Sequence, residues 1–213
     1  MKSQDPPSEQ LQSIVNLLTQ RRLKQALSES SQMLEKFPNS VILFNIVGAS
    51  NAGLREFDAA IESYKKALEI KPDYAEAYYN MGIALKDKGD PEAAIDSYKQ
   101  ALKIKPDYAE AYNNMGVALK RVVFTKPSSG LQEVISSMID RKNNVNPVAA
   151  ISLLKFEPVV KELFEKHFAG EVKQSLERLI SNLSGVPLLF KLMSVCPLPD
   201  LELEAVFTDI RSA

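Results

Sequence analysis

The sequence predicts an all-α protein, in which a short solenoid of helix hairpins is followed by a second helical domain. Pro38, Pro72 and Pro106 stand 34 residues apart. Small and aromatic residues recur in register between these prolines, and the pattern stops after Arg121. A repeat of this length is typical of solenoids whose unit is one pair of helices. We therefore expect a repeat array in the first half of the chain and a different domain after it.

The repeat sets the expected domain boundaries. The array runs over residues 7–121, as three blocks of 34 residues and a half repeat: 7–40, 41–74, 75–108 and 109–121. Residues 1–6 are expected to form a disordered tail. Residues 122–213 are expected to form a helical cap or adaptor domain, and their last amphipathic segment ends without a capping signal. We therefore expect that this domain is truncated inside its last helix.

Apolar spacing within one block predicts two amphipathic helices. Residues 75–88 place one stripe at i, i+3, i+4 and i+7: Tyr78, Met81, Gly82 and Leu85. Residues 92–105 place a second stripe in the same way: Ala94, Tyr98, Ala101 and Leu102. The lysines of the second helices are expected on a solvated outer face: Lys65, Lys66, Lys71, Lys99, Lys103 and Lys105. Each block is therefore predicted to be a helix hairpin.

Glycine and acidic residues in the blocks predict close packing and helix ends. Gly82 and Gly116 fall inside predicted helices, where glycine costs about 1 kcal/mol relative to alanine. We expect that a neighbouring backbone approaches closely there. Gly89-Asp90-Pro91 predicts a turn, an N-cap and a first helical residue. The pairs Asp73 with Glu76 and Asp107 with Glu110 have the spacing of a capping box.

The matched positions together resemble the tetratricopeptide repeat. They are Phe44, Tyr78 and Tyr112; Gly48, Gly82 and Gly116; Ala26, Ala60 and Ala94; Tyr64 and Tyr98; Ala67 and Ala101; and the three prolines. The first block departs from this pattern, with Ile14 and Ser30 where the second block has Gly48 and Tyr64, so it is expected to act as a terminal cap. The resemblance implies a right-handed superhelix whose first helices line a concave groove.

Family geometry implies which residues line that groove. The predicted peptide-binding residues are Asn45, Tyr79, Asn80, Ile83, Lys86, Asn113, Asn114, Val117 and Lys120. Further groove positions implied in the same way are Leu11, Gln12, Val15, Ile46, Ala49, Glu76 and Glu110. The lysine, asparagine and arginine clamp that some members of the family use for a chaperone C-terminus is absent, because its positions carry Leu11, Val15, Ile46, Glu76 and Asn80. We therefore do not expect chaperone binding.

Asparagines on the implied groove predict the mode of binding. An asparagine amide both donates and accepts hydrogen bonds, so a row of them can hold the backbone of an extended peptide. Asn80 and Asn114 resemble two rungs of the asparagine ladder in O-GlcNAc transferase-like proteins. With Tyr79 and Asn113 they are the expected anchors, and alanine at both Asn80 and Asn114 is expected to abolish peptide binding without lowering stability. The alternative interpretation is that these residues are solvated and serve no dedicated ligand.

The second half is predicted to be helical on three apolar stripes. These are Leu131, Val134, Ile135, Met138 and Ile139; Val160, Leu163, Phe164, His167 and Phe168; and Val172, Leu176, Leu179, Ile180 and Leu183. Two segments, residues 122–127 and 196–202, resemble the region that follows the repeats in longer bacterial proteins with an S-adenosylmethionine-dependent methyltransferase domain. The resemblance implies a second functional hypothesis, that this chain is the non-catalytic recruiting or regulatory part of such an enzyme.

Composition narrows the classes of function. The 213 residues carry a net charge of −1, which gives no broad basic field for nucleic acid or an anionic membrane. No glycine-rich cofactor loop, catalytic motif or metal-binding set is present, so we expect no enzyme activity, cofactor or metal. His167 is interpreted as a packed or partly exposed helix residue and Cys196 as a small buried hydrophobe. A cytoplasmic protein that binds a protein or peptide, with self-association through apolar repeat edges left open, is the prediction.

Overall fold

The computed structural model describes residues 5–120, Val122, the segment Leu131–Asp140 and Val160. Contacts divide the chain into a first unit, residues 1–118, and a second unit, residues 119–213. Every regular element in the described residues is an α-helix. The described part of the chain contains no helix that is both long and apolar enough to cross a membrane.

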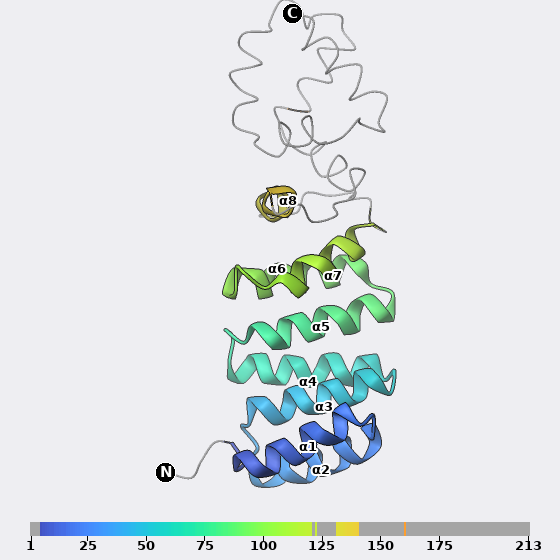
Figure 1. Ribbon diagram of the computed structural model, residues 1–213, viewed down its shortest axis with the longest axis vertical. Helices are drawn as coiled ribbons and strands as arrows, with labels where there is room; N and C mark the ends of the chain where they lie inside the picture. Colours follow the sequence, from blue (N-terminus) through green and yellow to red (C-terminus); the bar gives the residue numbers. More distant parts are fainter. Residues whose placement is uncertain (1–4, 121, 123–130, 141–159, 161–213) are drawn as a thin grey trace, which may run out of the picture. The chain divides into compact units, whose positions relative to one another are not determined.

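The first unit consists of helices that alternate with short turns, as the spacing predicts. In chain order they are α1 Ser8–Thr19, α2 Leu23–Lys36, α3 Val41–Gly53, α4 Phe57–Ile70, α5 Ala75–Lys88, α6 Pro91–Ile104 and α7 Ala109–Leu119. The helices stack in chain order, from α1 and α2 to α6 and α7 (Figure 1). Each odd-numbered helix is the first helix of a repeat, and α1 contacts α3 as α3 contacts α5. The first helices therefore lie side by side in a row.

Helix α5, the first helix of the third repeat, packs on two sides. Gly82 on α5 faces the Tyr98 ring of α6 in its own hairpin. The alanines Ala77 and Ala84 of the same helix are also buried, and Ala84 belongs to a cluster with Ala60 and Tyr64 of the preceding helix α4. The sequence stripe found only the first of these two faces, because alanine at a seven-residue spacing is a weak hydrophobic signal.

The close approach predicted at the glycines is made by a side chain and not by a backbone. A Cβ atom on Gly48 would lie 2.5 Å from Cε1 of Tyr64, and one on Gly82 would lie 2.6 Å from Cε1 of Tyr98. Both tyrosines are almost fully buried, and burial raises the pKa of each hydroxyl far above 10. The expectation of backbone contact was wrong at Gly82, because the missing side chain makes room for an aromatic ring, and at Gly116 it stays a prediction.

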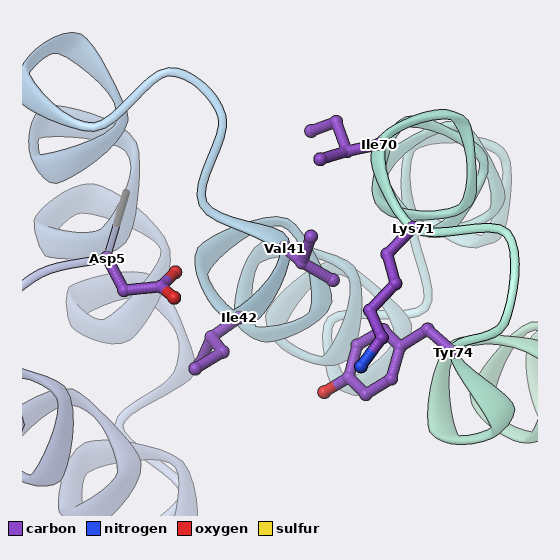
Figure 2. A pocket seen from close by; sticks show the side chains of 6 residues that line it. All are labelled: Asp5, Val41, Ile42, Ile70, Lys71 and Tyr74. Carbon is purple, nitrogen blue, oxygen red and sulfur yellow. The ribbon is translucent and has the colours of Figure 1, made fainter. Parts of the chain in front are cut away.

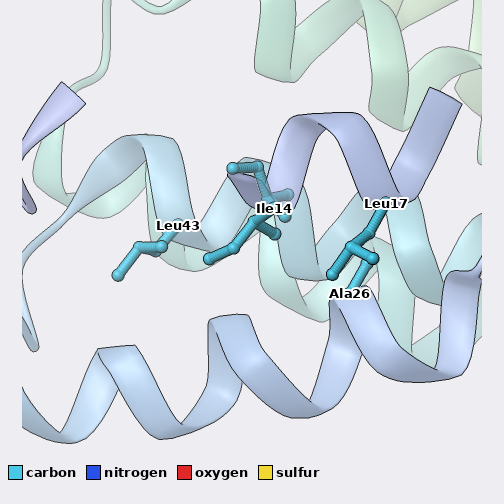
Figure 3. Packing of buried hydrophobic residues seen from close by; sticks show 5 residues of the cluster. Ile14, Leu17, Ala26 and Leu43 are labelled. Carbon is cyan, nitrogen blue, oxygen red and sulfur yellow. The ribbon is translucent and has the colours of Figure 1, made fainter. Parts of the chain in front are cut away.

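The first hairpin has its own core. Ile14 and Leu17 of α1 pack with Ala26 of α2 and with Leu43 and Ile46 of α3, as Figure 3 shows for the four residues that it labels. Ser30 of α2 is fully buried and donates a hydrogen bond to the Ala26 carbonyl at 2.7 Å. The first block thus joins the solenoid through an aliphatic cluster instead of a glycine and a tyrosine.

Helix ends follow the sequence at one turn and depart from it at another. Gly89 has a φ of 102° and caps α5, Asp90 accepts from the Ala93 N–H at 3.1 Å, and Pro91 begins α6, all as predicted. The capping box at Asp73 was wrong, because Tyr74 is the N-cap of α5 and makes no side-chain cap bond. The backbone begins the helix one residue later than the acidic pattern implies.

The structure also places Lys99 of the second helices and two residues of the predicted N-terminal tail. Lys99, expected on the solvated face, is buried at 7% exposure and pairs with Asp96 at 3.2 Å, so that expectation was wrong. Asp5 and Pro6 fall in the predicted tail. Pro6 is buried, and Asp5 accepts a hydrogen bond from the hydroxyl of Ser40, the N-cap of α3.

In the second unit the structure describes one helix, α8 Leu131–Asp140. Leu131, Ile135 and Met138 on this helix are fully buried, which confirms the first of the three predicted stripes. The other two stripes, apart from the buried Val160, lie outside the described residues, as do His167 and Cys196. The segments that carry the methyltransferase resemblance also lie outside them, except for Val122, so this resemblance stays a prediction.

Candidate peptide-binding surface

Polar side chains of α3, α5 and α7 form a hydrogen-bonded row across the repeats. Asn80 Nδ2 on α5 donates to Asn45 Oδ1 on α3 at 3.0 Å. Asn114 Nδ2 on α7 donates to the Tyr79 hydroxyl on α5 at 2.9 Å. Both bonds join residues 35 apart, so each runs from one first helix back to the first helix before it. We call Asn45, Tyr79, Asn80 and Asn114 the polar row.

The period of the repeat explains this spacing of 35 residues. Equivalent residues are 34 apart, so a residue 35 positions later is the next residue along the neighbouring first helix. Asn80 and Asn114 occupy equivalent positions, and Asn45 and Tyr79 occupy the position just before. All four side chains are partly buried. The sequence found the residues of this row, but it did not indicate that they bond to one another.

Tyr79 joins the polar row to a group of aromatic rings. Its ring centroid lies 4.8 Å from that of Tyr108 and 6.1 Å from that of Tyr98, and both pairs are tilted. Such pairs contribute about 0.5–1.5 kcal/mol beyond the area that they bury. Burial and the nearby Glu110 carboxylate raise the pKa of Tyr79, whereas the bond from Asn114 opposes this shift. The hydroxyl is therefore neutral near pH 7.

Tyr98 and Tyr108 are residues that the predicted site did not include. Burial, with the charges of Tyr79, Glu76, Glu110 and Tyr74, raises the pKa of Tyr108 to about 12. Lys105 Nζ lies 4.5 Å from the centroid of the Tyr108 ring, and Lys71 lies 5.5 Å from that of Tyr74. The repeated Lys-Pro-Asp-Tyr of residues 71–74 and 105–108 is a sequence signal that could have pointed to these turns.

The other predicted groove residues differ in their exposure. Ile83 is partly buried, Lys86 pairs with Asp87 at 3.3 Å, and Asn113 is exposed. Val117 is 49% exposed on α7. Lys120 is exposed but follows the boundary at residue 118, so it belongs to the second unit.

Among the further implied positions, Ile46 lies in the core instead of on the surface, because it is only 4% exposed and belongs to the first hydrophobic cluster. Its assignment to the groove was wrong, since its side chain packs with the aliphatic residues of that cluster. Leu11 is partly buried and packs against the same cluster. Val15 is exposed, and Gln12 donates to Asn16 Oδ1 at 3.0 Å on the same helix.

No metal site accompanies this surface. In residues 5–120 and α8, no three histidine, cysteine, aspartate or glutamate side chains are grouped so that they could hold a metal ion. The polar row consists of amides and phenols, which are neutral groups near pH 7 and bind by hydrogen bonding. The chemistry that this surface offers is therefore recognition of hydrogen-bonding groups.

The hairpins, their stacking and the row of first helices define a solenoid of helix hairpins. Residues 56–89 and 84–122 match the sequence family described as TPR repeat, which confirms the predicted repeats over that part of the chain. The solved TPR domain of Sgt2 from Aspergillus fumigatus has the same fold, with a TM-score of 0.52 at 15% identity. That likeness covers 62% of this chain and 99% of the other.

Two particular relatives illustrate where such repeats occur. One is the probable UDP-N-acetylglucosamine–peptide N-acetylglucosaminyltransferase SEC of Arabidopsis thaliana, 39% identical over 67 residues, or 32% of this chain and 7% of the relative. Another is the peroxisomal targeting signal receptor of Kluyveromyces lactis, 39% identical over 56 residues, or 26% of this chain and 10% of that receptor. The chain therefore matches only a small part of either relative.

A solved O-GlcNAc transferase of Thermobaculum terrenum shares the fold at a TM-score of 0.52 and 19% identity. The likeness covers 66% of this chain but 27% of the transferase chain. What the two molecules share is thus the stacking of helix hairpins.

Proposed function

We propose that this chain is a protein-interaction module that binds an extended peptide along the row of first helices. The observation that carries the proposal is the polar row, in which two asparagines at equivalent positions of successive repeats each donate a hydrogen bond to the first helix before, one to Asn45 and the other to Tyr79. The similarity of the repeats to a peptide N-acetylglucosaminyltransferase and to a targeting-signal receptor supports the same class of function.

The bonds within the row prepare these amides for a ligand. Each bond uses one N–H of the asparagine, and an amide has a second N–H and a carbonyl oxygen that can accept. The neighbouring helix fixes the side-chain rotamer, so a peptide would not have to order it on binding. Two amides one repeat apart can then bond to the backbone of a ligand without selecting its side chains.

Random-sequence peptides on an array, probed with the full chain, test the proposal. Peptides that the natural chain retains are then measured against the double variant Asn80→Ala, Asn114→Ala by calorimetry. We expect at least about a tenfold loss of affinity, because two hydrogen bonds to the ligand are removed. The matched control is Asn16→Ala, which removes an exposed asparagine that accepts a hydrogen bond on α1.

Two outcomes would count against the proposal. The first is that no peptide on the array is retained by the natural chain. The second is an unchanged affinity in the double variant whose helical circular dichroism matches that of the natural chain. Because both asparagines bond to other repeats, we expect a small loss of stability as well, so the expectation that stability is unaffected is revised.

A further inference from the structure

A cavity of about 450 Å³ lies beside the second repeat, where α3 begins and α4 ends. Its lining is Asp5, Val41, Ile42, Ile70, Lys71 and Tyr74, and Figure 2 shows these side chains around the opening. Cavities of this size are within the range of about 300–1,000 Å³ that is usual for ligand sites. Three branched aliphatic side chains and one aromatic ring form most of the lining.

The next repeat shows what can lie on the equivalent tyrosine. Tyr108 is the counterpart of Tyr74, one repeat later, and the Tyr79 ring packs against it at 4.8 Å. The counterpart of Tyr79 in the second repeat is Asn45, which has no ring. Asn45 follows Val41 and Ile42 of the cavity lining by about one helical turn. The cavity therefore lies about one helical turn from the position at which the second repeat lacks the aromatic residue of the third, and it is lined by the tyrosine equivalent to Tyr108.

Charge in the lining favours a neutral occupant. Asp5 and Lys71 contribute one carboxylate and one ammonium group, so the cavity has no net charge. Asp5 accepts from the Ser40 hydroxyl, and Lys71 lies over the Tyr74 ring. Ile42 is 37% exposed, which leaves apolar surface for a ligand to cover. A charged side chain would lose its hydration here and meet both signs of charge.

We propose that this cavity takes an aromatic side chain of the extended peptide, packed on Tyr74 as Tyr79 packs on Tyr108. The inference rests on the proposed function and adds to it a preference for one aromatic residue at the Asn45 end of the polar row. The polar row would hold the backbone of the peptide, and the cavity would select one of its side chains.

Single-residue probes test the cavity apart from the polar row. The full chain is titrated with the N-acetyl methylamides of phenylalanine, leucine and lysine, and the methyl NMR signals of Ile42 and Ile70 are followed. We expect the phenylalanine probe to shift both signals and to bind about three- to tenfold more tightly than the leucine probe. Equal binding of the three probes, or shifts confined to other residues, would overturn the inference.

Two substitutions taken from the third repeat make the test sharper. Asn45→Tyr supplies the missing ring, and the new hydroxyl can accept from Asn80 as Tyr79 accepts from Asn114. Ile42→Glu supplies the residue that the third repeat has at this position, Glu76. Each is expected to weaken the phenylalanine probe by at least about fivefold. Ile42 is exposed, so the second variant remains informative if the first fails to fold.

Ile104→Glu is the matched control, because Ile104 is 38% exposed and lies outside the cavity lining. Equal weakening by this control would overturn the inference, since the effect would then be one of general charge. Signals of Ile42 that shift with protein concentration and no probe would also overturn it, because a second copy would then fill the cavity. Binding of the probe without any retained array peptide would instead contradict the proposed function.

Discussion

The first hairpin and the two that follow solve the same packing problem in opposite ways. In the second and third repeats the first helix carries the small residue and the second helix the large one, Gly48 with Tyr64 and Gly82 with Tyr98. In the first repeat the large residue is Ile14 on the first helix and the small one is Ser30 on the second, and both are fully buried. One position of each pair is large and the other is small, and the large side chain can come from either helix.

This difference also changes what the repeats can do. A tyrosine at this position places a ring and a hydroxyl between the two helices of the hairpin. The Tyr98 ring in turn packs against Tyr79, which belongs to the polar row. The aliphatic cluster of the first repeat instead includes Ile46 of α3. A terminal repeat needs only to cover the end of the array, whereas internal repeats also present a surface.

The largest expected effect is the removal of one interface tyrosine. Tyr64→Ser leaves a cavity beside Gly48, and we expect unfolding to require about 3–5 kcal/mol less free energy. Urea unfolding followed by helical circular dichroism measures the change. Lys65→Ser, at the exposed next residue of α4, is the control and should change stability by less than about 0.5 kcal/mol.

A double variant built on Tyr64→Ser tests whether the two packing arrangements are interchangeable. Adding Gly48→Ile to Tyr64→Ser transfers the pair of the first repeat into the second. If the two arrangements are equivalent, the double variant recovers stability, with a coupling energy of about 0.5–3 kcal/mol. An additive double variant would show that the first repeat relies on its neighbours and not on this exchange of sizes.

Alkaline pH distinguishes the repeats by their tyrosines. Burial raises the pKa of Tyr64 and Tyr98 above the usual value of 10, so the folded state keeps protons that the unfolded chain loses. Stability from these groups is complete below pH 10 and is lost as pH rises above it, by about 1 kcal/mol per pH unit for each ring. Thermal unfolding at a series of alkaline pH values measures this. The double variant Gly48→Ile, Tyr64→Ser should show a smaller slope, and an equal slope would contradict the assignment.

A smaller effect tests the fit between glycine and ring in the third repeat. Gly82→Ala places a Cβ against the Tyr98 ring, and we expect a loss of about 1–3 kcal/mol despite the better helix propensity of alanine. Gly53→Ala is the matched control, because its Cβ would meet only the flexible side chain of Leu23, whose end can move aside. Chemical unfolding should therefore show a clearly larger loss of stability for Gly82→Ala than for Gly53→Ala.

The smallest expected effect concerns the polar row. Asn80→Ala removes one partly buried hydrogen bond to Asn45 and should cost about 0.5–1.5 kcal/mol. Asn45→Ala and the double variant complete a mutant cycle, read by urea unfolding. Stabilities that add without coupling would mean that the bond contributes nothing, and the prearranged row would lose its physical basis.

The predictable part of the fold rests on periodic residues. The prolines, the alanines and the i, i+4 stripes place α5 and α6 within one residue of their ends, because helix formation and amphipathic spacing are local properties. The turn at Gly89, Asp90 and Pro91 is local in the same sense. The capping box at Asp73 was wrong because α5 begins one residue later, with Tyr74 as its N-cap. A capping box is a local signal, whereas the first residue of this helix also depends on how the hairpin packs.

The predictable part of the site is the choice of residues, not their contacts. The implied positions included Asn45, Tyr79, Asn80 and Asn114, which do come together. They also included Ile46, which is in the core, and they missed the rings of Tyr98 and Tyr108. Family positions assume a regular repeat, and the contact of α3 with the aliphatic first hairpin is the place where this assumption fails.

The sequence by itself determined the helices, the period of the array and the atypical character of its first block. These follow from spacing and from the sizes of residues within one hairpin. Only the tertiary structure decided that Gly48 and Gly82 receive a ring, that the asparagines bond backward along the row, and that a cavity opens beside Tyr74. These features depend on how neighbouring hairpins meet, and residues 34 positions apart come together only when the hairpins stack.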